Sequence, residues 1–156
     1  MKRILVLIAS HILVGTIGFG IGIYVLPIII APDSPTAGEV RAGLGETGFE
    51  GQFQRSLKGS DFLHWGEGTV YVSPESIALI GELAPGPDYK LYLSPTFVET
   101  EAEFLQMKSK MVRVGDVKTF NNFIVPVPKK IDPNQFSTVI VWCETFSQFI
   151  TAAQYK

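Results

Sequence analysis

Two side chains are the main candidates for chemistry in this sequence: Cys143, its only cysteine, and His64, one of its two histidines. One cysteine cannot form an internal disulfide, and it cannot hold an iron–sulfur cluster, which needs about four thiolates. The CxxCH pattern that attaches a haem covalently is absent. Two nitrogen or sulfur ligands are also too few for a structural zinc site, so we expect no metal centre of that kind.

A haem bound without covalent attachment is compatible with so few ligands, because one or two axial side chains are enough to hold its iron. Cys143 and His64 are candidate ligands for it, and Met107 and Met111 are others. Cys143 could instead act as a bare redox thiol. A third interpretation is structural: Cys143 is an inert hydrophobe in a core strand, where burial raises its pKa, and His64 is a surface residue. Composition alone leaves these alternatives open.

Hydrolytic activity finds little support in the sequence. No GxSxG motif is present, and a Ser–His–Asp set would have to be assembled around His64 without any signature. Asp and Glu are abundant enough for a two-carboxylate hydrolase, but an ordinary acidic surface has the same composition. Whether the chain is an enzyme stays open, and we do not expect a hydrolase.

The N-terminal segment 4–30 determines where any such chemistry takes place, because it contains no charged residue. A helix needs about 20 apolar residues to cross a hydrocarbon core roughly 30 Å thick, so this segment is long enough to span a membrane. A cleavable signal peptide would have a shorter apolar run followed by small residues, whereas bulky residues occupy 28–30. We therefore predict an uncleaved transmembrane anchor.

Charge predicts the orientation of this anchor. Lys2 and Arg3 precede it and no basic residue follows closely, so the N-terminus should stay in the cytoplasm. The rest of the chain should lie on the periplasmic or extracellular side of the cell membrane. After the anchor there are 11 basic and 15 acidic residues, a net charge of −4. A net negative charge does not provide the basic surface that binds nucleic acids, so we expect no nucleic-acid partner.

Gly18 and Gly22 form a GxxxG pattern within the anchor. Small residues at this spacing let two membrane helices approach closely, which predicts helix-mediated self-association. The alternative is that glycine is simply common in membrane helices.

The remaining chain divides into a linker and one domain. Segment 31–47 is rich in proline, glycine and small residues and lacks strand-like alternation, which favours a tether. Residues 48–156 contain no repeat and suffice for a single domain.

Short runs of β-branched and aromatic residues, separated by turn signals, indicate an all-β domain. Segment 138–143 is apolar on both faces, as in a strand buried at the centre of a sandwich. A helical turn is expected only at 99–108, and Pro126 and Pro128 belong at a strand edge or end. We predict an antiparallel β-sandwich or barrel-like fold with strands at 49–57, 68–73, 76–81, 89–94, 111–118, 121–127, 137–144 and 147–153.

The order of these features resembles the DM13 domain family. The most specific match is the block around Trp142 and Cys143, whereas residues 99–110 fit least, so no role is transferred to Met107. The segments that carry the resemblance are 48–53, His64 with 68–70, 86–93, 131–132, 136–144, Phe149 and 152–153.

This resemblance implies a β-sandwich related to the DOMON class and a role in electron transfer, with Cys143 as a bare thiol or a haem ligand; His64 remains the candidate for a second ligand. The first functional hypothesis is therefore an electron-transfer module at the membrane surface that exchanges electrons with a partner protein of the envelope. The alternative is a non-catalytic binding or scaffolding domain in which Cys143 is structural.

Overall fold

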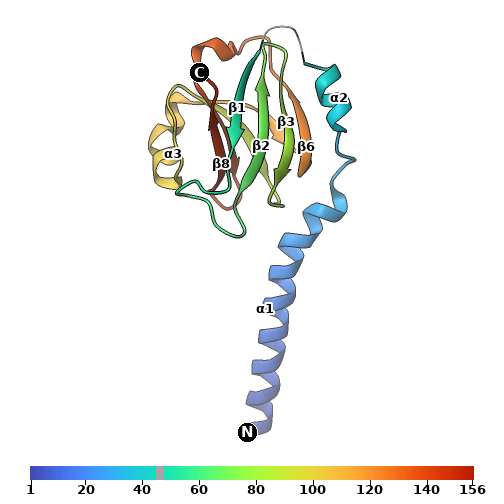
Figure 1. The fold of residues 1–156 in the computed structure, drawn as a ribbon. Helices are drawn as coiled ribbons and strands as arrows, with labels where there is room; N and C mark the ends of the chain where they lie inside the picture. Colours follow the sequence, from blue (N-terminus) through green and yellow to red (C-terminus); the bar gives the residue numbers. More distant parts are fainter. Residues whose placement is uncertain (45–47) are drawn as a thin grey trace.

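The computed structural model describes residues 1–44 and 48–156 and consists of a long helix joined to a β-sandwich (Figure 1). Helix α1 runs from Lys2 to Ile30 and is the one helix among the described residues long and apolar enough to cross a membrane. Pro27 lies near its end, where proline removes a backbone donor and favours a bend. The predicted apolar helix is therefore present.

A short helix, α2 (Ala37–Ala42), lies within the segment expected to be a linker. Its first turn is closed by a capping box in which Thr36 and Glu39 satisfy each other's backbone N–H groups. Val40 is fully buried, and Asn122 donates to the carbonyl of Pro35 at 2.8 Å. The chain is thus held against the sandwich directly after α1, while residues 45–47 of the expected linker lie outside the described residues.

Within residues 1–44 and 48–156, eight strands form two antiparallel four-stranded sheets, so the predicted sandwich is confirmed. One sheet has the order β1 (Phe49–Phe53), β2 (Gly66–Val72), β3 (Ser76–Leu83), β6 (Asn121–Pro126). The other has the order β5 (Val112–Val117), β4 (Tyr89–Ser94), β7 (Thr138–Cys143), β8 (Gln148–Gln154).

The barrel-like alternative is wrong, because the two sheets do not close on each other. Strands β1 and β8 lie near each other, as do β5 and β6, but neither pair is joined in a ladder among the described residues. Strand β6 is an edge strand that ends at Pro126, which cannot donate a ladder hydrogen bond. The expected placement of Pro126 is confirmed.

Strand β7 is an interior strand of its sheet, and all six of its residues are buried, as predicted from its apolar sequence. Its alternate side chains point to opposite faces. Cys143 belongs to the core between the sheets, whereas Trp142 packs on the outer face of its sheet, under helix α3 (Glu101–Met107). The short helix η1 (Lys108–Lys110) follows α3. Phe104 of α3 stacks on Trp142 with ring centroids 3.9 Å apart. The predicted helical turn at 99–108 is confirmed. A second short helix, η2 (Pro133–Gln135), precedes β7.

Candidate functional site

A cavity of about 680 Å³ lies where the last third of α1 meets the end of the sandwich. Its lining is mostly apolar and comes from α1, from the β1–β2, β3–β4 and β7–β8 loops, and from the ends of β4, β7 and β8. Both predicted site residues, Cys143 and His64, line it together with Gly20, Ile21, Ile23, Tyr24, Val25, Leu63, Pro85, Gly86, Pro87, Tyr89, Phe146, Gln148 and Ile150. The fold therefore brings to one place two side chains that are far apart in the sequence.

Cys143 is the last residue of β7, opposite Tyr89 in the antiparallel ladder with β4. It is a free cysteine with 2% of its surface exposed. Burial raises the pKa of the thiol, and the backbone amides of Phe146, Asp88 and Thr145 oppose this effect without cancelling it. At neutral pH Cys143 is consequently an uncharged thiol on the cavity wall.

His64 is positioned by a carboxylate in its own loop. Asp61 Oδ1 accepts from the backbone N–H groups of Leu63 and His64 at 2.7 and 2.8 Å, and Asp61 Oδ2 lies 2.9 Å from Nδ1 of the imidazole. Burial opposes the charge on Asp61, but the hydrogen bond from His64 and the backbone N–H groups outweigh burial and lower the pKa of this carboxyl. An ionised carboxylate only accepts, so Nδ1 carries a proton, and in the neutral imidazole the lone pair is then on Nε2.

Tyr89 forms part of the cavity wall beside Cys143. Its ring lies against Gly86, where any side chain would collide with the ring atoms. It also meets Phe120 edge to face, with centroids 5.9 Å apart. Burial strongly raises the pKa of Tyr89, which keeps the phenol neutral. Gly86 therefore permits the packing that shapes this wall.

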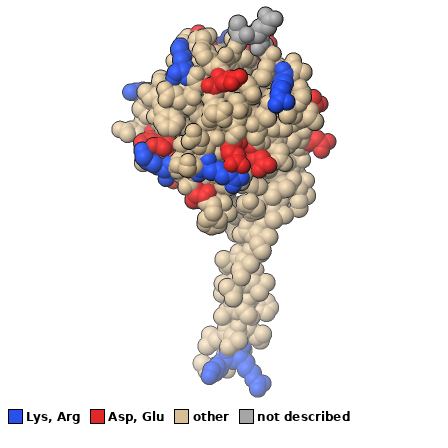
Figure 2. Space-filling model, viewed as in Figure 1, with Lys and Arg blue, Asp and Glu red and all other residues tan. Residues whose placement is uncertain are grey.

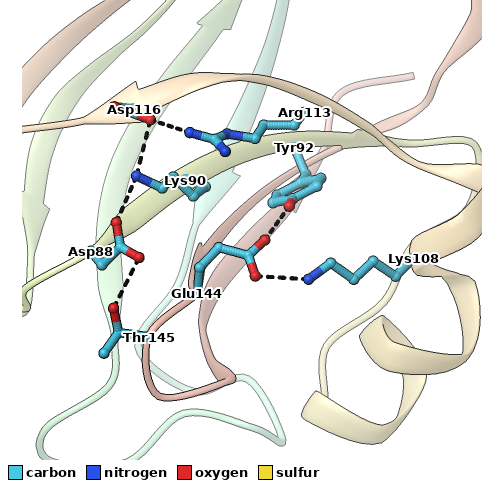
Figure 3. A network of polar contacts seen from close by, with 8 residues as sticks. All are labelled: Asp88, Lys90, Tyr92, Lys108, Arg113, Asp116, Glu144 and Thr145. Carbon is cyan, nitrogen blue, oxygen red and sulfur yellow. Dashed lines mark hydrogen bonds and ion pairs between the residues drawn. The ribbon is translucent and has the colours of Figure 1, made fainter.

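On the outer face of the second sheet, Glu144 joins the site to α3 and η1 (Figure 3). It accepts hydrogen bonds from the hydroxyl of Tyr92 and from Nζ of Lys108, the latter at 2.8 Å. Burial opposes ionisation of Glu144, but these two bonds outweigh it and lower its pKa. The residue directly after Cys143 is thereby fixed in place.

A second set of ion pairs holds the neighbouring backbone (Figure 3). Lys90 Nζ lies 2.6 Å from Asp88 and 3.1 Å from Asp116, and Arg113 pairs with Asp116 at 2.6 Å. Asp88 also accepts from the hydroxyl of Thr145 at 3.0 Å. These contacts tie the start of β4 to the β7–β8 turn, the two segments that carry Tyr89 and Cys143.

The methionines considered as haem ligands lie elsewhere. Met107 and Met111 pack beside the cluster around Trp142, on the opposite face of β7 from Cys143. No group of three or more His, Cys, Asp and Glu residues in the described part of the chain is placed to hold a metal ion.

Sequence reasoning did not find three parts of the site: the wall formed by α1, the Asp61 contact, and Gln148. The spacing Asp61-x-x-His64 was a usable signal, because a loop carboxylate three residues before a histidine can reach its ring. Contact between α1 and the sandwich had no counterpart in the sequence pattern.

The family profile described as "Electron transfer DM13" matches residues 56–155, which include both His64 and Cys143. No curated protein and no solved structure matches the chain. The matched region covers most of the sandwich and well over half of the sequence, and it includes the segments quoted for the resemblance from His64 onward, whereas segment 48–53 lies before it. The chain belongs to the DM13 family of electron-transfer domains.

Proposed function

We propose that this protein is a membrane-anchored electron-transfer domain on the non-cytoplasmic side of the cell membrane, and that its redox centre is at Cys143. The observation that carries the proposal is that Cys143 and His64 line one largely apolar cavity. Buried, water-poor surroundings of this kind control the reduction potential of a bound redox group.

A haem bound between Cys143 and His64 is compatible with these residues. The cavity is mostly apolar, as cofactor sites usually are, and its volume of about 680 Å³ lies in the range of such sites. The pairing of Nδ1 with Asp61 makes Nε2 the atom of His64 that would bind the haem iron, and metal-binding histidines commonly donate their other ring N–H to a carboxylate in this way. When bound, haem would supply one-electron transfer at its iron.

The properties of Cys143 favour a ligand over a bare thiol. The thiolate is the nucleophile in thiol chemistry, and burial disfavours that form here. A metal ligand bond deprotonates a cysteine outright, which overcomes the raised pKa. A bare redox thiol would instead react slowly at neutral pH.

The second candidate is a non-catalytic binding or scaffolding domain. One observation favours it: Cys143 belongs to the buried core cluster between the sheets and is 2% exposed, as a structural cysteine would be. On this account Cys143→Ala would cost stability alone.

The experiment that separates the two is a haem titration of the full-length protein in detergent, followed by its absorption spectrum. The electron-transfer account predicts saturable binding near one haem per chain in the wild type and loss of the ligated spectrum in Cys143→Ser. Met107→Leu is the matched control, because Met107 lies outside the cavity. Identical spectra for the wild type and Cys143→Ser would instead support the binding domain.

A further inference from the structure

The end of the sandwich beside α1 exposes large apolar side chains. Phe62 is 86% exposed, Phe146 is 53% exposed and Leu63 is 40% exposed. They come from two separate segments, the β1–β2 loop and the β7–β8 turn, and Leu63 and Phe146 line the same cavity as α1. We call these three residues the apolar rim. Exposed apolar groups gathered in this way mark an interaction surface.

The length of α1 determines how deep the apolar rim lies relative to the lipid bilayer. A hydrocarbon core roughly 30 Å thick takes up about 20 helical residues, and counting from Ile4 places its far boundary near Ile23. The α1 residues that line the cavity lie on both sides of that boundary, from Gly20 to Val25. Tyr24, an aromatic residue of the type enriched at membrane interfaces, is among them. Side chains that share a cavity with these residues must lie at the level of the lipid headgroups.

Charge is distributed in agreement with this depth. On the face shown in Figure 2, the narrow junction between the domain and α1 consists mostly of uncharged residues. Charged side chains come close to the C-terminal end of the helix, beyond the α1 residues that line the cavity: Asp88, Lys90, Asp116 and Lys118 share a pocket with Pro27, Ile30, Ala31 and Pro32. Lys and Arg gather at the free end of the helix (Figure 2), as expected at the opposite surface of the bilayer. At the other end of the sandwich, the β2–β3 turn carries the exposed Glu75.

We propose that the apolar rim inserts into the headgroup layer of the leaflet on the domain's side, so that the lipid bilayer is the partner of this surface. The inference rests on the transmembrane anchor in the proposed function, and it replaces a domain raised on a tether with one docked on the membrane. The cavity then opens at the level of the headgroups, and Cys143 is approached from the lipid side.

The test uses two single-tryptophan additions in the full-length protein, Phe62→Trp in the rim and Glu75→Trp at the opposite end. Each variant and the wild type is reconstituted into phosphatidylcholine vesicles whose acyl chains are brominated near the headgroup, a contact quencher of tryptophan. Subtracting the wild-type emission removes Trp65 and Trp142. Flotation of the vesicles reports separately whether the anchor holds the protein in the membrane.

We expect Phe62→Trp to lose a several-fold larger fraction of its added emission to the bromolipid than Glu75→Trp, which should instead be quenched by iodide in the water. Protein that floats with the vesicles but shows equal, weak bromolipid quenching at both positions contradicts docking while leaving the anchor intact. Protection of position 62 from both quenchers means that a second copy covers the rim and also overturns the proposal. Protein that does not float contradicts the anchor, and docking with it.

Discussion

Nδ1 of His64 lies 2.9 Å from Oδ2 of Asp61, and this contact selects the imidazole tautomer in which Nε2 has the free lone pair. The same carboxylate accepts two backbone N–H groups of the loop, so the position of the imidazole and the shape of the loop depend on one residue. Asp61 thus positions a side chain that lines the same cavity as Cys143.

Replacing Asp61 with asparagine should weaken haem binding about 10- to 100-fold, as loss of the carboxylate that orients a metal-binding histidine commonly does. His64→Ala should weaken it further and change the spectrum, because it removes the ligand itself. Haem titration monitored by absorbance measures both effects.

Asp132→Asn is the matched control for Asp61→Asn. Asp132 forms the same kind of turn, accepting from the backbone N–H of Asn134 at 3.0 Å, but its hydrogen-bond partners do not line the cavity, whereas those of Asp61, Leu63 and His64, do. Equal haem affinity in the Asp61 and Asp132 variants would contradict the role of Asp61 in positioning His64.

The reactivity of Cys143 should depend on pH in a way that reflects its burial. Its pKa is raised in the folded protein, so alkylation by iodoacetamide should be slow at neutral pH and should accelerate only above the usual thiol pKa of about 8.5. The rate in denaturant, where the thiol is exposed, should rise at lower pH. A folded-state rate profile that matches the denatured one would contradict the raised pKa.

The same shift predicts how stability changes with pH. Between the unfolded and the raised folded pKa the folded state holds more protons, so its free energy of unfolding falls as pH rises. The contribution of Cys143 is complete below about pH 8.5 and is lost as pH passes the folded value. Cys143→Ala should therefore show a shallower decline in unfolding free energy above that pH, measured by denaturant titration.

Strand positions were predictable because their chemistry is local. The apolar residues of 138–143 and the turn residues of 73–75 report directly on burial and chain reversal, and the corresponding strands are present. Helix α2 was missed because the prolines and glycines around it indicated a linker, although the capping pair Thr36 and Glu39 was visible in the sequence. Capping chemistry was the better signal there.

The candidate site was predictable only in part. Cys143 and His64 stood out because such residues are rare in this chain, but their meeting in one cavity depends on the end of β7 and the β1–β2 loop lying at the same end of the sandwich. Contact between Leu63 and residues of α1 depends on how the helix leaves the domain, which periodicity does not encode.

Phe104→Ala should be among the most destabilising substitutions outside the central core. Phe104 is fully buried and stacks on Trp142, so truncation should lower the free energy of unfolding by about 3–5 kcal/mol. Leu105→Ala, on the same helix but 49% exposed, is the control and should cost much less. Denaturant unfolding followed by the fluorescence of Trp142 compares them; similar losses would show that α3 is not anchored by Phe104.

Gly86→Ala should disturb the cavity wall, because the added methyl group collides with the ring of Tyr89. Overpacking of this kind costs about 1–3 kcal/mol and should also reduce haem affinity by displacing Tyr89. Gly38→Ala in α2 meets only ordinary contacts and should leave both properties unchanged. Unfolding curves and haem titrations of the two variants provide the comparison. Equal unfolding free energies and equal haem affinities would contradict a role for Tyr89 in the site.

The central claim, that Cys143 is the redox centre, is tested most directly by the absorption spectrum of the full-length protein with added haem, recorded in oxidised and reduced forms for the wild type and Cys143→Ser. The electron-transfer account predicts a ligated haem spectrum that changes reversibly on reduction in the wild type and is lost in Cys143→Ser, which should remain folded. A wild-type protein that binds no haem and whose thiol stays unreactive toward oxidants until denatured would contradict the account.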